Sequence, residues 1–154
     1  MKDIVEITKE IGFEAAHYLH NPKWDRGRNL EVFKKCSGLR KDDPTAAGYP
    51  HGHSYRLQVT VAGPVDPSTG FVMDFKVLKG ILRTEVAERF DHRFLNKEVS
   101  PFREDPSFQP TVENLLRVIW GQLEPALRKE KTKLSLLTLW ETPTSFGTYR
   151  GGKK

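Results

Sequence analysis

The order in which hydrophobic periods follow one another along the chain constrains its fold more than any other sequence feature. Apolar residues alternate with a period of two in residues 4–17 and again in residues 51–63, which indicates β-strands. Two later segments repeat at helical spacing instead. Their apolar stripes comprise Leu78, Leu82, Val86 and Phe90 in the first, and Leu115, Leu116, Ile119, Trp120 and Leu123 in the second. Residues 134–142 and 146–150 predict two further strands.

This β-β-α-α-β-β order keeps strands and helices in separate groups, which is typical of an α+β fold with an antiparallel sheet. We expect a four-stranded antiparallel sheet with two helices on one face, while the other face meets solvent or another subunit. A short strand at Phe71–Met73 leads into the first helix, for which Asp74 is a suitable N-cap. The second helix is expected to end before Pro125, because proline has no backbone N–H to donate.

Residues 21–50 contain several prolines and glycines and show little periodicity, so they predict a long loop with one helical turn at residues 29–35. Loops of this length in compact domains usually serve a function or are disordered. The sequence contains no internal repeat and no low-complexity linker. Residues 1–154 are therefore expected to form a single domain.

Composition narrows the cellular setting and the class of partner. A single cysteine precludes an intrachain disulfide and fits a reducing compartment, and the acidic N-terminal segment is unlike a signal peptide, so we expect a cytoplasmic protein. No apolar run approaches the roughly 20 residues of a membrane-spanning helix, so no membrane partner is expected. The net charge of +5 comes from 25 basic residues scattered among 20 acidic ones, which suits a small polyanion such as a triphosphate better than nucleic acid.

The triplet His51-Gly52-His53 carries the strongest chemical signal. Residues two apart on a strand point to the same side, so two imidazoles placed this way are able to share one metal ion. His17 lies on another predicted strand, and three histidines with one open position form a catalytic zinc arrangement. The residues alone leave a second interpretation open, in which these are surface or core-edge histidines that never meet.

Other residues able to carry chemistry are more ambiguous. Asp91 and His92 follow the first predicted helix and form either a solvated helix end or an acid–base pair, which would need a turn to bring their side chains together. Cys36 is either a bystander thiol or one that a nearby cation acidifies. Glu141 continues the inward face of a strand, and an acid there is either exposed at the strand end or accepts two N–H groups of a ligand.

Six stretches, taken together, resemble the 6-pyruvoyltetrahydropterin synthase and 6-carboxytetrahydropterin synthase family. They are FEAAH (13–17), CSG…HGHSY (36–55), VAGPVDPSTGFVMDFKVLK (61–79), FDHRFLN (90–96), PTVENL (110–115) and ET…Y (141–149). The resemblance implies the tunnelling fold, or T-fold, of the same β-β-α-α-β-β type. It also implies a homohexamer built as a dimer of trimers, with active sites where subunits meet.

The resemblance assigns roles to individual residues. The residues that match zinc ligands are His17, His51 and His53. Those that match the catalytic triad are Cys36, Asp91 and His92. The residues that match the pterin-binding positions are Thr111, Glu113 and Glu141, of which Glu141 corresponds to the carboxylate that grips the pterin ring.

The sequence departs from the family pattern before the HGH motif. Fourteen residues separate Cys36 from His51, and the stretch RKDDPTAAGYP indicates an insertion at about residues 38–50. The loop must therefore double back for the thiol to reach the metal pocket.

The substrate that the resemblance implies is 7,8-dihydroneopterin triphosphate. We expect the 6-carboxytetrahydropterin product of queuosine and deazapurine biosynthesis, with the 6-pyruvoyl product of tetrahydrobiopterin biosynthesis as the alternative. A non-catalytic metal- or pterin-binding module is a third interpretation.

Overall fold

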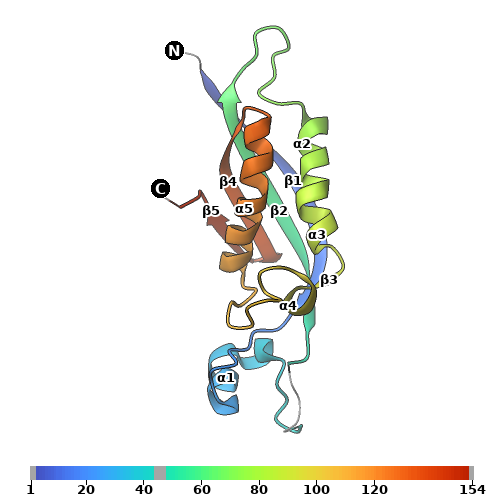
Figure 1. The fold of residues 1–154 in the computed structure, drawn as a ribbon, viewed down its shortest axis with the longest axis vertical. Helices are drawn as coiled ribbons and strands as arrows, with labels where there is room; N and C mark the ends of the chain where they lie inside the picture. The colour runs from blue at the N-terminus through green and yellow to red at the C-terminus, as the bar shows by residue number, and fades with distance from the viewer. Residues whose placement is uncertain (1–2, 44–47, 153–154) are drawn as a thin grey trace.

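The computed structural model describes residues 3–43 and 48–152, whose strands form one sheet in the order β3-β1-β2-β4-β5 (Figure 1). The strands are β1 (Ile4–His17), β2 (His51–Pro64), β3 (Arg93–Phe94), β4 (Lys133–Thr142) and β5 (Ser145–Tyr149). The predicted α+β fold is confirmed, and the four long strands are antiparallel neighbours. The expectation of four strands was wrong, because β3 adds a parallel pairing with β1. A two-residue strand is too short to leave a periodic signal in the sequence.

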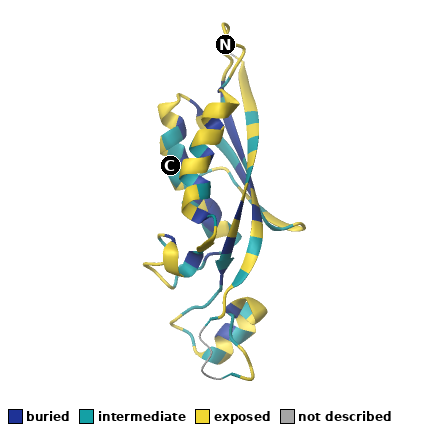
Figure 2. Ribbon diagram, turned by 90° about the vertical axis from the view of Figure 1, so that its right-hand side faces the viewer, coloured by how far each residue is buried: buried dark blue, intermediate teal, exposed yellow. Residues whose placement is uncertain are grey.

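Two long helical segments cover one face of the sheet, as predicted (Figure 2). The first consists of α2 (Phe75–Leu82), a π-helical turn (Arg83–Ala87) and α3 (Glu88–Phe90). The side chains of its stripe are all buried, namely Leu78, Leu82, Val86 and Phe90. Residues spaced by four drift about 40° per step around an ideal α-helix. The wider π-helical turn offsets this drift and keeps the stripe against the sheet.

The second long helix, α5 (Val112–Lys129), continues past the proline at which it was expected to end. Pro125 lies inside the helix, and Leu127 beyond it is fully buried. The carbonyl oxygen of Leu127 accepts hydrogen bonds from the Thr132 hydroxyl at 3.1 Å and the Thr132 N–H at 3.2 Å. Burial of Leu127 and these two bonds therefore offset the hydrogen bond that the proline removes.

Strand parity separates a buried face of the sheet from a polar one. Phe13, Tyr55 and Leu139 lie on the buried face beneath the helices, in the positions that alternation predicts. The opposite face carries polar cross-strand pairs such as the Thr8 and Thr60 hydroxyls, which are 2.8 Å apart. Among the described residues, no layer covers this second face (Figure 2).

The segment predicted as a long loop contains more structure than expected. It forms α1 (Arg26–Phe33) and a 3-10 turn (Lys34–Ser37), which lie beyond the end of the sheet (Figure 1). The Asp25 carboxylate caps α1 by accepting a hydrogen bond from the Arg28 N–H at 2.8 Å. The expected insertion at about residues 38–50 includes residues 44–47, which lie outside the described residues.

The short strand predicted at Phe71–Met73 does not form, because this segment has no partner in the sheet. The Asp66 N–H instead donates to the Phe71 carbonyl oxygen at 2.9 Å and closes a turn, after which Met73 packs into the core. A remaining short helix, α4 (Leu95–Glu98), follows β3. Within the described residues, no helix has both the length and the apolar character needed to cross a membrane.

Candidate metal centre

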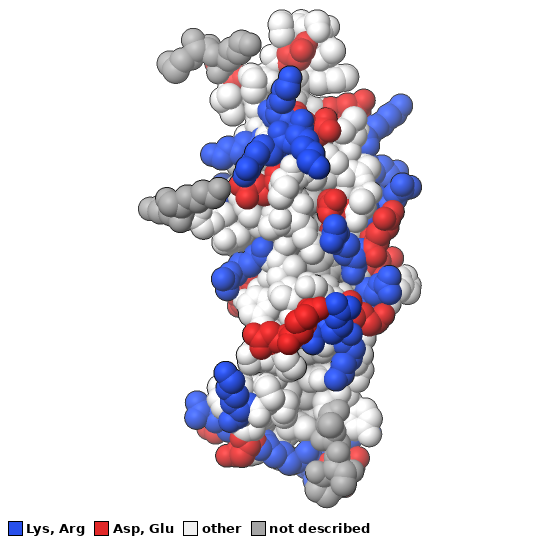
Figure 3. Space-filling view, in the orientation of Figure 1, with Lys and Arg blue, Asp and Glu red and all other residues white. Residues whose placement is uncertain are grey.

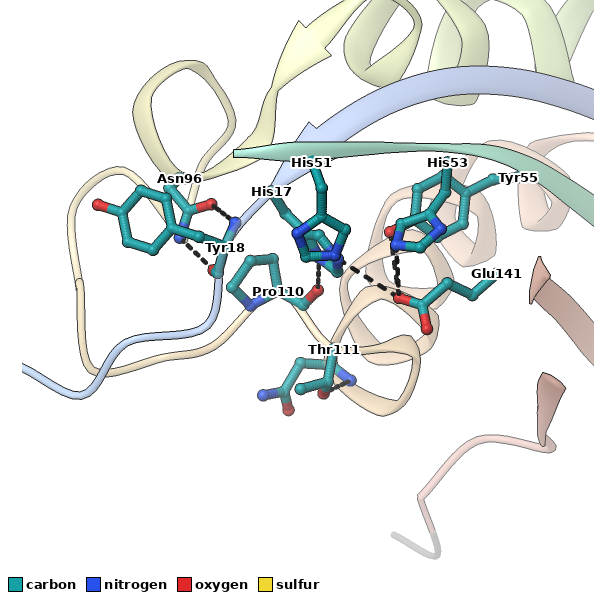
Figure 4. Close-up of polar contacts among 10 residues, drawn as sticks. His17, Tyr18, His51, His53, Tyr55, Asn96, Pro110, Thr111 and Glu141 are labelled. Carbon is teal, nitrogen blue, oxygen red and sulfur yellow. Dashed lines mark hydrogen bonds and ion pairs between the residues drawn. The ribbon is translucent and has the colours of Figure 1, made fainter. Parts of the chain in front are cut away.

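Three histidine side chains meet where β1 and β2 pair at one end of the sheet. His17 and His51 are direct cross-strand partners, and His53 lies two residues further along the same face of β2. One ring nitrogen from each histidine lies within 4.8 Å of those from the other two, and the Nε2 atoms of His17 and His51 are 3.0 Å apart (Figure 4). The structure therefore brings together the three histidines that the strand parity and the family resemblance indicated.

His17 is held in one tautomer by the loop that precedes α5. Its Nδ1 lies 2.8 Å from the carbonyl oxygen of Pro110, and a carbonyl only accepts, so Nδ1–H is the donor and Nε2 faces the other histidines. Burial is the main cause that lowers the pKa of His17 to about 4; the hydrogen bond to Pro110 opposes this shift, and the nearby His51 and His53 rings add to it. His17 is therefore neutral at physiological pH, as metal coordination requires.

The donor set fits a tetrahedral zinc ion. Zinc–nitrogen bonds of about 2.0–2.1 Å in tetrahedral geometry place ligand nitrogens roughly 3.3–3.4 Å apart. The Nε2 atom of His17 lies 3.0 Å from Nε2 of His51, and the ligand atoms of all three histidines lie within 4.8 Å of one another. The spacing expected for zinc ligands falls within this range. Three imidazoles would leave one position open for another ligand, as in catalytic zinc sites.

Glu141, near the end of β4, points at the same cluster. Its Oε1 lies 3.6 Å from Nε2 of His17 and 3.8 Å from Nε2 of His53. The Tyr55 hydroxyl donates to the same oxygen at 3.5 Å, and burial together with the Glu141 charge raises the pKa of Tyr55. The carboxylate is 25% exposed and lines an open cavity of about 510 Å³, so it is accessible to a ligand. The expectation that Glu141 continues an inward-facing row of side chains is met.

Cys36 lies near this end of the sheet despite the long connection to His51. It sits in the 3-10 turn after α1, where its carbonyl oxygen accepts a hydrogen bond from the Leu19 N–H at 2.7 Å, two residues beyond His17. Burial and the negative charge of Glu141 raise the pKa of the Cys36 thiol. The influence of Glu141 places the sulfur within electrostatic reach of the cluster, although its residue is exposed.

Comparison with known proteins decides the family. Residues 6–152 match the sequence profile described as 6-pyruvoyl tetrahydropterin synthase. The chain belongs to this family. A 6-pyruvoyl tetrahydrobiopterin synthase of Drosophila melanogaster is 37% identical over 145 residues, which are 94% of this chain and 79% of the fly protein. The human protein of the same name is 31% identical and the match covers 95% of this chain and 91% of that protein.

A solved structure confirms the predicted T-fold. The structure of Caenorhabditis elegans 6-pyruvoyl tetrahydropterin synthase superposes with a TM-score of 0.83 at 31% identity, covering 98% of both chains. A 6-carboxy-5,6,7,8-tetrahydropterin synthase of Haemophilus influenzae is 28% identical and the match covers 94% of this chain. The comparisons therefore support the 6-pyruvoyl alternative better than the 6-carboxy product that the sequence motifs favoured.

The pair of Asp91 and His92, which the resemblance matches to the family's catalytic partners of the cysteine, lies beside β1, where His92 and His53 line the same open hollow of about 440 Å³. The left-handed backbone of His92, with φ of 57°, makes the turn that brings its Nδ1 to 3.1 Å from Asp91 Oδ1. The Glu14 N–H and His92 lower the pKa of Asp91. Within the described part of the chain, no hydrogen bond or ion pair joins this pair to Cys36 or to the three histidines.

The segment matching the family's pterin pocket begins next to the residue that holds His17. Thr111 caps α5 by accepting from the Asn114 N–H at 3.4 Å, and it follows Pro110 directly (Figure 4). Glu113 is exposed in the first turn of the same helix. The structure thus places Thr111 beside the metal centre and leaves Glu113 on the surface of this subunit.

Sequence reasoning missed two contributors to the site. The Pro110 carbonyl could not be found, because a backbone atom carries no residue-type signal. Tyr55 had a signal, since it follows His53 by two positions and so shares its face of β2. Its aromatic ring also fits the alternating apolar row of residues 51–63, so the pattern predicts a core residue at Tyr55.

The lowered pKa of His17 predicts how the metal-free protein responds to acid. The unfolded state binds a proton near the ordinary value of 6.5, whereas the folded state does so only near about 4. Stability should therefore fall as pH decreases from about 6.5 to about 4, by roughly 3 kcal/mol from this residue. Urea unfolding of the metal-free protein across this range measures the slope.

His17→Gln should reduce that slope by up to one proton, because the variant has no imidazole to titrate at this position. An equal slope in the wild type and in His17→Gln would show that His17 does not carry the effect.

Proposed function

We propose that the protein is a zinc-dependent 6-pyruvoyltetrahydropterin synthase, a cytoplasmic lyase that acts on 7,8-dihydroneopterin triphosphate. The observation that carries the proposal is the convergence of His17, His51, His53 and Glu141 in a chain of this family. Relatives that are 31–37% identical along almost the whole chain bear the 6-pyruvoyl name. The reaction would eliminate triphosphate and keep the carbon skeleton of the side chain.

The metal and the pterin would be held by separate groups. His17, His51 and His53 would hold zinc, which when bound supplies Lewis acidity to the side-chain oxygens of the substrate. Glu141 would accept two N–H groups of the pterin ring, since a carboxylate matches a planar pair of donors. Glu141 lines an open cavity, which supports this role.

Proton transfer would fall to Cys36 and to His92. The thiol would move a proton on the side chain of the substrate, and His92 would act as a second acid or base with Asp91 orienting its ring. No hydrogen bond or ion pair joins Asp91 or His92 to Cys36 in the described part of one chain. We therefore propose a homo-oligomer, with a hexamer of two stacked trimers as the expected form, in which the pair serves the site of a neighbouring subunit.

The triphosphate requires positive charge near the site, but one cluster of basic residues lies far from the histidines. Figure 3 shows Lys and Arg gathered over the C-terminal end of α5, where Arg128 and Lys129 lie in the last turn. The histidines lie at the end of β1 and the start of β2, which is the end of the sheet nearer to α1 and far from this end of α5 (Figure 1). Lys34 and Lys35 are better candidates, because they are exposed in the same 3-10 turn as Cys36.

Product analysis tests the reaction directly. Purified enzyme incubated with 7,8-dihydroneopterin triphosphate should release triphosphate and yield a pterin that keeps its side-chain carbons, identified by mass spectrometry. Release of acetaldehyde together with a 6-carboxy pterin would establish the alternative reaction instead. Unchanged substrate in the presence of bound zinc would favour the non-catalytic binding module.

Metal analysis of a ligand variant tests the zinc site. His51→Ala should lose most of its zinc and all measurable turnover while remaining folded, because the remaining two imidazoles cannot complete the site and His51 lies outside the apolar core. Elemental analysis and circular dichroism measure the two properties. His92→Ala is the control and should retain about one zinc per subunit, and full zinc occupancy in His51→Ala would rule out the assignment.

Pterin binding tests Glu141. Glu141→Gln replaces an acceptor oxygen with an N–H group that would face an N–H group of the ligand, so pterin affinity should fall by roughly 2–4 kcal/mol without loss of zinc. Calorimetric titration with a pterin analogue measures the change. Glu124→Gln, which alters the carboxylate paired with Arg128 at the far end of α5, should bind normally. Equal affinities for wild type and Glu141→Gln would contradict the role.

A further inference from the structure

The four residues that follow His17, which we call the connecting segment (residues 18–21), leave the sheet but keep a strand-like pattern of hydrogen bonds. Their partners are side-chain amides in place of another strand. At Tyr18, the Asn96 side chain accepts from the backbone N–H at 3.0 Å and donates to the carbonyl oxygen at 3.0 Å (Figure 4). One amide group thus satisfies both backbone groups of one residue, as a paired strand would.

Gln109 repeats this arrangement two residues further along. Its Oε1 accepts from the His20 N–H at 2.8 Å, and its Nε2 donates to the His20 carbonyl oxygen at 2.9 Å. Gln109 directly precedes Pro110, whose carbonyl holds the ring of His17. The same loop therefore fixes a metal ligand and the chain that leads away from it.

Asn29 makes the third contact of this kind, from within α1. Its Oδ1 accepts from the Asn21 N–H at 2.8 Å, and its Nδ2 donates to the Asn21 carbonyl oxygen at 3.0 Å. The same Nδ2 lies 3.2 Å from the Trp24 carbonyl and 3.1 Å from that of Asp25. Asn29 is completely buried, so no water can replace these bonds.

The connecting segment also holds Cys36. Its Leu19 N–H donates to the Cys36 carbonyl oxygen at 2.7 Å, between the residues held by Asn96 and Gln109. The place of the thiol relative to His17 is thus set through a few hydrogen bonds from side-chain amides. We infer that Gln109 and Asn29 are positioning residues, which fix Cys36 relative to the three histidines.

This inference rests on the proposed function for its effect on turnover, because it assumes that the Cys36 thiol takes part in the reaction. The geometric part is independent of that assumption. Cys36 is the single cysteine of the sequence, so alkylation of the protein reports its surroundings without interference. A thiol's reaction rate depends on its ionisation and its access, and both change when the group moves.

The experiment compares Gln109→Met with wild type in the zinc-loaded enzyme. Methionine keeps the length of the side chain but removes both hydrogen bonds to His20. We expect Gln109→Met to retain its zinc. The rate at which iodoacetamide alkylates Cys36 should change by about threefold or more. The value of kcat should fall about tenfold or more with KM nearly constant, because a small misplacement of a reacting group slows the reaction strongly. Gln109→Glu keeps the acceptor for the His20 N–H and should give an intermediate result, and it serves as the second variant should Gln109→Met fail to fold.

Thr132→Val is the matched control. It removes a buried hydrogen bond to the Leu127 carbonyl at the far end of α5, so it should lower the melting temperature without changing the thiol rate or kcat. Equal alkylation rates and equal kcat in wild type and folded Gln109→Met would overturn the inference. A loss of zinc in parallel with activity would also overturn it, because Gln109 would then position His17 and not Cys36. If Cys36→Ala turns over normally, the proposed role of the thiol fails, while the alkylation rates still decide whether Gln109 positions it.

Discussion

The hydrogen bond from His17 to the Pro110 carbonyl is the interaction on which the rest of the site depends. It joins the end of β1 to the loop before α5, two parts of the chain that are 93 residues apart. It also fixes the tautomer of a ring that is only 1% exposed and directs Nε2 toward His51 and His53. Since Gln109 and Thr111 flank Pro110, the same loop reaches the connecting segment on one side and the first turn of α5 on the other.

The metal-free cluster carries an electrostatic imbalance that a cation would remove. Glu141 lies within 4 Å of two imidazoles and accepts a weak hydrogen bond from Tyr55 at 3.5 Å. His17 resists protonation because it is buried, so it cannot balance that carboxylate with its own charge. A divalent ion among the three ring nitrogens would supply positive charge without protonating any of them.

The sequence predicted those parts of the site that depend on strand parity. Alternation placed His51 and His53 on one face of β2 and put Glu141 in line with the buried residues of β4, because side chains two apart on a strand share a face. The expectation that His17 joins them came from the family resemblance. The sequence could not predict the Pro110 contact or the amide contacts of Asn29, because backbone partners are chosen by tertiary structure. It missed β3 because two residues show no period, and it ended α5 too early because burial of Leu127 outweighs the local effect of Pro125.

A single subunit contains all the proposed groups but does not assemble them. Asp91 is bound to the backbone of Glu14 on the β1 edge of the sheet, and the exposed His92 ring extends from there. If the pair serves the same reaction as Cys36, as we propose, the thiol of another copy is its expected partner, because no hydrogen bond or ion pair joins the pair to Cys36 in the described part of one chain. The polar sheet face, which no helix in the described ranges 3–43 and 48–152 covers, is consistent with a fold that is completed by association.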